Sequence, residues 1–529
     1  MQSKLSFIET YLYFYAWGLA VLSSLYKIFQ SQSDLFDNDP GLIYIFYDLK
    51  PGWKFIARHK DVSDIEWIAW KYLFQTSFLY LIIQFLISES IRNTFPKLIK
   101  HWYIASSIFY IVLNTGAKSL FLILIQPVIY SFIIFLGGKR ILIWMISIIF
   151  LAGFNSLKNK YYFWDFLDHK NIKDEEIYLL LFCVAWVELR CISFSLEYIE
   201  SIEKNAGSEE HEQTKKSKID QIVNMLSYVL YLPLLYVGPV MLYEQFEKSF
   251  TTQCKDLSIR VKSFLKDMVL YQIYTFIIDL SLHFIYFYAM ATDIETVKQL
   301  PALGICGGGV YMGLQFYMKY VTSYGTTTAF ARLDNNEPPP TPRCLFRIHV
   351  YSQMWRYFDV GLYTFLVKYI YKPCYKLIPN YVQLPKKVWK LIAALSTFSF
   401  IFLWHGTVLN IFVWTVLNYI GILLEFTAVG ISYTTAYKWF KENVLITEAM
   451  ETRFIAFCCA PLLGLSAVSN FYLFAGTEVG TLYFELLKDV TLMNFSLVYL
   501  ALYSCCHVSI ALKDVPSRTD IRTPLTKTE

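Results

Sequence analysis

The sequence predicts an all-α protein that crosses a membrane many times, and three observations support this. Hydrophobic residues make up 56% of the 529 positions. Charged residues make up only 17%, against about 25% in ordinary globular chains. The apolar residues also form about thirteen runs, spread almost from end to end, that are long enough for a membrane span or a re-entrant segment. We therefore expect one polytopic membrane domain, residues 1–529, with roughly ten to twelve transmembrane helices plus re-entrant segments.

The net charge and the cysteines narrow the functional classes. A net charge of +5 gives no reason to expect a nucleic acid partner, and membrane lipids are the expected surroundings. The ten cysteines contain no CxxC pair and no spacing typical of a zinc site or a disulfide framework. Most of them are expected to be buried free thiols.

Taken in chain order, the first segments alternate between spans and polar connections. The apolar run at about residues 11–29 follows no clear basic region and no small-residue cleavage site, so it predicts a retained membrane anchor. Residues 33–64 mix prolines, charges and aromatic residues and predict an interfacial loop. Residues 202–220 are the most hydrophilic stretch and predict a solvated loop, and residues 513–529 predict a polar tail.

A glycine-rich run and a proline-rich run follow in the second half. The glycines between Gly304 and Gly309 lack the Gly-Lys-Ser/Thr ending of a phosphate loop. The pairs Gly304/Gly308 and Gly309/Gly313 have the spacing of small residues that let membrane helices pack closely. Four prolines within residues 338–342 exclude a regular helix and predict a stiff connector.

The longest uncharged run, Leu391 to Leu424, carries one side chain that titrates near neutral pH, His405. As a single helix, its 34 residues would be about 51 Å long, whereas a bilayer core is about 30 Å thick. The run must therefore break or split, and His405 and Gly406 lie near its middle. An intramembrane imidazole is costly and usually functional, which makes His405 a candidate general base. A histidine bonded to a neighbouring carbonyl is the alternative.

Asp359 is the second candidate, because it lies among apolar neighbours and needs a partner. Arg356 would supply one as an i,i+3 pair on the same helix. The other possible partners are a substrate amine and His405. Asn410, five residues after His405, is a weaker candidate hydrogen-bond donor because on a helix it faces away from His405.

Cys344 is the third candidate. Its thiol follows Arg343 at the end of the proline-rich connector, so its pKa is expected to be lowered. An unremarkable free thiol is the alternative.

Three segments of the chain resemble one known family. They are residues 332–344, which end in Pro342-Arg343-Cys344; residues 354–371, which contain Trp355-Arg356-Tyr357-Phe358-Asp359; and residues 404–425, which begin with Trp404-His405-Gly406. They resemble the membrane-bound O-acyltransferases, and most closely the protein-cysteine N-palmitoyltransferase branch, the hedgehog acyltransferases. Weaker similarities occur at Arg190-Cys191-Ile192-Ser193-Phe194 and Gly238-Pro239, so the resemblance covers about residues 190–425.

The resemblance implies roles for five residues. His405 matches the family's catalytic histidine, and Asp359 matches its second catalytic position. Members that acylate hydroxyls mostly carry asparagine there, whereas the hedgehog branch carries aspartate. Cys344 matches a thiolate that binds haem iron in that branch. Trp355, with Arg356 beside it, matches the lining of the acyl-CoA channel.

The resemblance also implies the reaction. A fatty acyl group, expected to be palmitoyl, would pass from acyl-CoA to the free N-terminal amine of a secreted, hedgehog-like protein in the endoplasmic reticulum membrane. The residues are chemically consistent with this. An α-amine has a pKa of about 7.7–8.0, so a sizeable minority is already neutral and a histidine base needs only to assist. A nearby carboxylate would orient the amine and stabilise its developing positive charge.

Three alternatives stay open at this point. An O-acyltransferase for a lipid or protein hydroxyl fits less well, because Asp359 occupies the position of asparagine. A transporter or channel is supported by a broken helix with a buried ionisable group, but no internal inverted repeat is visible. A non-catalytic scaffold is disfavoured by the presence of both His405 and Asp359.

Overall fold

The computed structural model describes residues 5–157, 166–167, 172–205, 218–381 and 383–513. The predicted all-α class is confirmed, since the strands among these residues are only β1 (Leu49–Pro51) and β2 (His59–Asp61), which pair antiparallel. Eight helices in the described ranges are long and apolar enough to cross a membrane. They are α1 (Phe7–Asn38), α3 (Ile65–Thr94), α4 (Ile99–Phe135), α7 (Asp174–Asn205), α17 (Lys386–His405), α18 (Leu409–Ser432), α20 (Glu448–Asp489) and α21 (Leu492–Leu512).

The remaining helices are shorter or more polar. Two of them, α10 (Leu257–Ser281) and α13 (Ala302–Leu333), are as long as the spans but include charged residues such as Lys262 and Lys319. The others are α2 (Leu42–Ile45), α5 (Arg140–Leu157), α8 (Lys218–Val229), α9 (Tyr243–Thr251), α11 (Phe287–Met290), α12 (Ile294–Lys298), α14 (Tyr351–Phe358), α15 (Val360–Leu366), α16 (Lys372–Leu377) and α19 (Thr435–Phe440).

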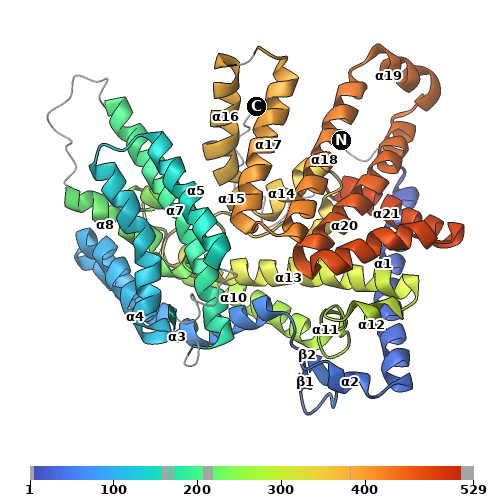
Figure 1. Ribbon diagram of the computed structural model, residues 1–529, viewed down its shortest axis with the longest axis horizontal. Helices are drawn as coiled ribbons and strands as arrows, with labels where there is room; N and C mark the ends of the chain where they lie inside the picture. Colours follow the sequence, from blue (N-terminus) through green and yellow to red (C-terminus); the bar gives the residue numbers. More distant parts are fainter. Residues whose placement is uncertain (1–4, 158–165, 168–171, 206–217, 382, 514–529) are drawn as a thin grey trace.

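Helix α13 organises the fold. It runs across the molecule in Figure 1, with α17 and α18 on one side and α11 and α12 on the other, while α3, α4, α5, α7 and α8 gather at one end. It packs against α10 and α1. Its glycines allow this close approach, because a Cβ added to Gly307 would overlap the backbone of Ser24 in α1, and one added to Gly308 would overlap Phe287. Among the four glycines of the two predicted pairs, only Gly313 has no atom within 4 Å of an added Cβ.

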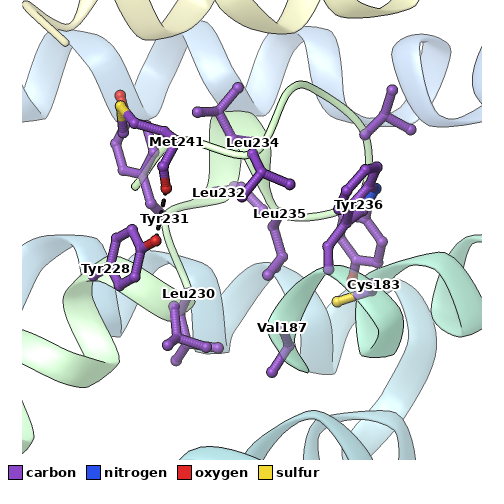
Figure 2. Packing of buried hydrophobic residues seen from close by; sticks show 14 of the residues in the cluster. Cys183, Val187, Tyr228, Leu230, Tyr231, Leu232, Leu234, Leu235, Tyr236 and Met241 are labelled. Atoms are coloured by element: carbon purple, nitrogen blue, oxygen red, sulfur yellow. Dashed lines mark hydrogen bonds between the residues drawn. The ribbon is translucent and has the colours of Figure 1, made fainter. Parts of the chain in front are cut away.

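A buried loop, residues 230–242, forms the centre of the largest hydrophobic core and leads to α9. Figure 2 shows its leucines and Tyr236 packing over Cys183 and Val187 of α7. Tyr228 closes the loop by donating a hydrogen bond to Met241 O at 2.6 Å. From α7, the buried guanidinium of Arg190 donates to Val229 O and Leu234 O.

The polar segments differ in how far the structure describes them. Residues 33–64 hold the end of α1, then α2 and the β1–β2 hairpin. The proline-rich connector is non-helical between α13 and a single 3-10 turn at Leu345–Arg347, as predicted. Most of the predicted loop at 202–220 and all but the first residue of the 513–529 tail lie outside the described residues.

Candidate functional site

The long uncharged run breaks at the predicted place. α17 ends at His405 and α18 begins at Leu409. Gly406, which follows the last helical residue, has φ +132, a conformation that residues with a Cβ rarely adopt. The glycine therefore explains why the helix ends here and why the imidazole of His405 lies at a helix end.

Aromatic rings hold His405 on two sides. The ring centroid of His405 lies 4.8 Å from that of Trp404 and 5.1 Å from that of Trp414 in α18. Trp404 is fixed in turn on α7, since its indole N–H donates to Ala185 O at 3.2 Å and its ring lies 5.1 Å from Trp186. These contacts set the side-chain direction at the end of α17.

The ring contacts continue to Trp355, the predicted channel residue. Trp355 of α14 meets Trp414 edge-on at 5.3 Å, so one ring separates it from His405. Its indole N–H donates to Asn418 Oδ1 at 2.8 Å, and that of Trp414 donates to Asn470 Oδ1 at 3.2 Å. The structure thus brings Trp355 and His405 into one aromatic cluster through Trp414.

Asp359 lies where the chain passes from α14 to α15. Its carboxylate, 9% exposed, caps α15 by accepting from the N–H of Leu362 at 2.9 Å, and it also accepts from the hydroxyl of Tyr324 at 2.9 Å. Burial raises the pKa of Asp359 above its ordinary value, against the opposing effect of these hydrogen bonds. Gly361 permits this location, because an added Cβ would overlap the backbone of Val240 in the buried loop.

The predicted ion pair between Arg356 and Asp359 is wrong. The chain leaves the helical conformation at Asp359 (φ −123, ψ 87), so the two side chains do not share a helix face. The guanidinium of Arg356 lies instead over the rings of Tyr357, at 5.7 Å, and Tyr363, at 5.9 Å. Within residues 218–381 the Asp359 carboxylate accepts only from neutral donors, which are the Tyr324 hydroxyl and backbone N–H groups at the start of α15.

The third resembling segment holds α14 against α18. Glu425 accepts from the backbone N–H of Ser352 at 2.9 Å and from its hydroxyl at 2.6 Å. A Cβ added to Gly421 would lie 2.5 Å from the ring of Tyr351. Asn410 donates to Tyr472 O at 3.2 Å.

Cys344 lines an open pocket with about 770 Å³ of atom-free space. Tyrosine and aliphatic side chains form much of its lining, and three arginines share it: Arg332, Arg343 and Arg347. The expected low pKa of Cys344 is wrong. Burial raises the pKa of this thiol and outweighs the lowering by the Phe346 N–H, the Tyr317 hydroxyl and two of the arginines. No group of three or more potential metal ligands occurs in the described ranges.

Comparison with known proteins identifies the family. The model of the membrane-bound O-acyltransferase family matches residues 129–469, more than half of the chain. The chain belongs to this family. The match contains His405, Asp359 and Cys344 together with every contact described for His405 and Asp359.

Individual acyltransferases are similar over nearly the whole chain. The protein-cysteine N-palmitoyltransferase Rasp of Drosophila melanogaster is 26% identical over 485 residues, 90% of each chain. The protein-cysteine N-palmitoyltransferase HHAT of Mus musculus is 23% identical over 92% of this chain and 94% of its own. The membrane-bound O-acyltransferase gup1 of Schizosaccharomyces pombe is 22% identical over 71% and 68%. This chain is therefore a multi-pass membrane acyltransferase.

Sequence reasoning missed the residues that surround the two candidate site residues. Trp414 and Tyr324 are aromatic residues within long helices. Nothing in the nearby sequence predicts that Trp414 contacts His405 or that Tyr324 contacts Asp359. One usable signal was Asn418, a fully buried amide within the uncharged run, which needs a partner and finds it in Trp355.

Proposed function

We propose that this acyltransferase transfers palmitate from palmitoyl-CoA to the N-terminal amine of a secreted, hedgehog-like protein at the endoplasmic reticulum membrane. Two relatives that carry the name protein-cysteine N-palmitoyltransferase, and are similar over nine-tenths of the chain, support this choice. The site residues support it independently.

The observation that carries the proposal is the partner set of Asp359. It is a buried carboxylate, and no lysine or arginine pairs with it in the described part of the chain. A buried negative charge of this kind favours a cationic substrate group through a charge-assisted hydrogen bond. An attacking α-amine becomes ammonium-like as it adds to the thioester carbonyl, whereas a hydroxyl offers no such charge.

His405 supplies the proton acceptor. The amine attacks the thioester carbonyl carbon, the carbon–sulfur bond breaks, and the CoA thiolate leaves. The amine must lose one proton, and the imidazole of His405 takes it before it passes to the thiolate. His405 is the last residue of α17, so its imidazole lies at the helix end beside Gly406.

Trp355 and Arg356 are proposed to line the acyl-CoA channel. The rings of Trp355 and Trp414 form an apolar wall that leads to His405, which suits a fatty acyl chain. Arg356 is half-buried, with its charge resting on tyrosine faces, and offers a cation to the phosphates of CoA.

We also propose haem at Cys344, because the pocket residues fit it. Cys344 offers a thiolate ligand, the tyrosines offer flat faces, and Arg343 and Arg347 offer cations for the haem carboxylates, whereas Arg332 already pairs with Asp267 of the same lining at 2.9 Å. Arg332 Nε is buried without a hydrogen-bond partner among the described residues. The Cys344 thiolate would hold the haem iron, and the role of the haem would be structural.

A peptide assay tests the reaction. Purified protein is incubated with labelled palmitoyl-CoA and a peptide that begins with cysteine, and the control is the same peptide with an acetylated N-terminus. We expect label only on the free amine, resistant to neutral hydroxylamine, which cleaves thioesters and, more slowly, oxygen esters. Label on the acetylated peptide, or release by hydroxylamine, would refute the N-acyl proposal: fast release indicates a thioester on the cysteine, and slow release an oxygen ester, as the O-acyltransferase alternative requires.

A further inference from the structure

The helix break after His405 removes one backbone hydrogen bond of the i to i−4 pattern. In an unbroken α-helix the N–H of residue 407 bonds to the carbonyl of residue 403. Here Gly406 leaves the helix and its N–H bonds to Phe402 O at 3.1 Å. The carbonyl of Leu403 and the N–H of Thr407, the two halves of one helical hydrogen bond, no longer meet.

Asn155 of α5 joins these two groups. Its Nδ2 donates to Leu403 O at 2.9 Å, and its Oδ1 accepts from the N–H of Thr407 at 3.3 Å. A carboxamide holds a donor and an acceptor in one planar group, as a peptide unit does, so it replaces the lost rung. Insertion of a side chain into the ladder is a known cause of a sharp helix break.

The bridged pair encloses His405. Leu403, two positions before His405, and Thr407, two positions after it, are both fixed on α5 through Asn155. Trp404 is fixed separately on α7 through Ala185. The backbone at the break is therefore held from two neighbouring helices, although its φ and ψ angles are not those of a helix.

We propose that Asn155 is a positioning residue for acyl transfer, which holds the break open and keeps the His405 imidazole in place. This rests on the proposed role of His405 as the base. A reacting group displaced by about 1 Å can cost on the order of 10²-fold in rate, so loss of the bridge lowers kcat. Because the side chain of Asn155 is engaged with the backbone of Leu403 and Thr407, we expect the KM for palmitoyl-CoA to stay the same.

Three substitutions in the full-length protein test the bridge. Asn155→Ala removes both hydrogen bonds, and Asn155→Asp sets a carboxylate against the Leu403 carbonyl. We expect each to lower kcat by about 10- to 100-fold at unchanged KM for palmitoyl-CoA. Asn155→Gln keeps the donor and acceptor and should recover most of the rate. The matched control is Asn114→Ala in α4, because within the described residues the Asn114 side chain bonds only to Tyr110 O of its own helix, at 3.0 Å.

Hydrogen exchange of the peptide that contains Thr407 gives a readout that needs no activity. Asn155→Ala should speed its exchange, and Asn114→Ala should leave it unchanged. Unchanged exchange in Asn155→Ala would overturn the bridge, and faster exchange with wild-type kcat would overturn the positioning role. If the wild-type protein acylates a hydroxyl peptide instead, the proposed acceptor fails, and the same kcat comparison made with that peptide still decides the role of Asn155.

Discussion

At the scale of single residues, the candidate site combines a half-buried imidazole with a buried carboxylate. His405 lies at a helix end between two tryptophans, and Asp359 lies at the start of α15 between two neutral donors. Neither arrangement favours stability, because a non-helical backbone within an apolar run and a buried carboxylate without a cationic partner both cost folding free energy. Such costs are typical of residues retained for chemistry.

His405→Ala should remove acyl transfer and leave acyl-CoA binding intact. Loss of a general base typically costs about 10²- to 10⁴-fold in rate. Single-turnover transfer is measured beside a thermal melt and binding of labelled palmitoyl-CoA. A well-folded variant with near wild-type turnover would refute the role of His405.

Asp359→Asn should lower activity without lowering stability. Because burial raises the pKa of Asp359 in the folded protein, the folded state holds its proton to higher pH than the unfolded state. The unfolding free energy therefore falls as pH rises through that interval, and asparagine removes this cost. Melting at neutral pH should be equal or higher in the variant, while amide formation drops sharply. A large fall in melting temperature would instead indicate a structural carboxylate.

Tyr324→Phe should move the acid limb of the pH–rate profile to higher pH. The Tyr324 hydroxyl donates to the carboxylate and favours its ionised form, so its removal raises the pKa of Asp359 further. Activity that needs the carboxylate is then lost at a higher pH on acidification. Tyr320→Phe is the control, since Tyr320 lies one turn away on α13 and donates to Glu66 at 3.0 Å. Equal profiles for the two variants would contradict the assignment.

The residue-scale predictions from sequence failed where they depended on distant contacts. His405 and Asp359 could be proposed as site residues because an ionisable group in an apolar run is visible locally. The Arg356 pair failed because the helix ends at Asp359, and the lowered pKa of Cys344 failed because its burial comes from other helices. Asn155 lies about 250 positions before the break that it bridges, and no local pattern marks it.

At the scale of elements, helix length determined which boundaries could be predicted from the sequence. The uncharged run was too long for one span, so its break at Gly406 followed from simple geometry. The short helices α14 and α15 were not predictable in this way, because they are placed by α18 and by the buried loop. Some residues in the segments that resemble the family therefore make the contacts that hold α14 and α15 in place.

Gly421→Ala should loosen α14 and lower activity. The added methyl group would lie 2.5 Å from the ring of Tyr351, and overpacking of this kind typically costs about 1–3 kcal/mol. Gly430→Ala in the same helix is the matched control, because its added methyl group meets open space. That change should be neutral or stabilising by up to about 1 kcal/mol. The two melting temperatures and transfer rates are compared, and equal behaviour would contradict the proposed docking of α14.

At the scale of the whole molecule, the Cys344 pocket joins distant parts of the chain. α10 and α13 line it, and Trp17 of α1 packs edge-on against Phe346 at 4.6 Å. The end of α21 is held there as well, since Arg343 donates to Lys513 O at 3.0 Å and Arg347 to Leu512 O at 2.9 Å. These cationic side chains also suit the negative end of the α21 dipole. The sequence predicted the stiff proline connector but not that α1 and the end of α21 would meet beside it.

A ligand at Cys344 should therefore stabilise the assembly of the whole fold. Protein purified from cells supplied with haem should absorb visible light with the spectrum of thiolate-ligated haem, and Cys344→Ala should lose this absorbance and melt at a lower temperature. Cys374→Ala is the control, because Cys374 is a half-buried thiol that contacts Ser396 and does not line the pocket. Iron binding also requires the thiolate, so the raised pKa of Cys344 predicts weaker haem uptake as pH falls. Wild-type protein without visible absorbance would reject haem here, whereas equal spectra for Cys344→Ala and wild type would place the haem on another ligand.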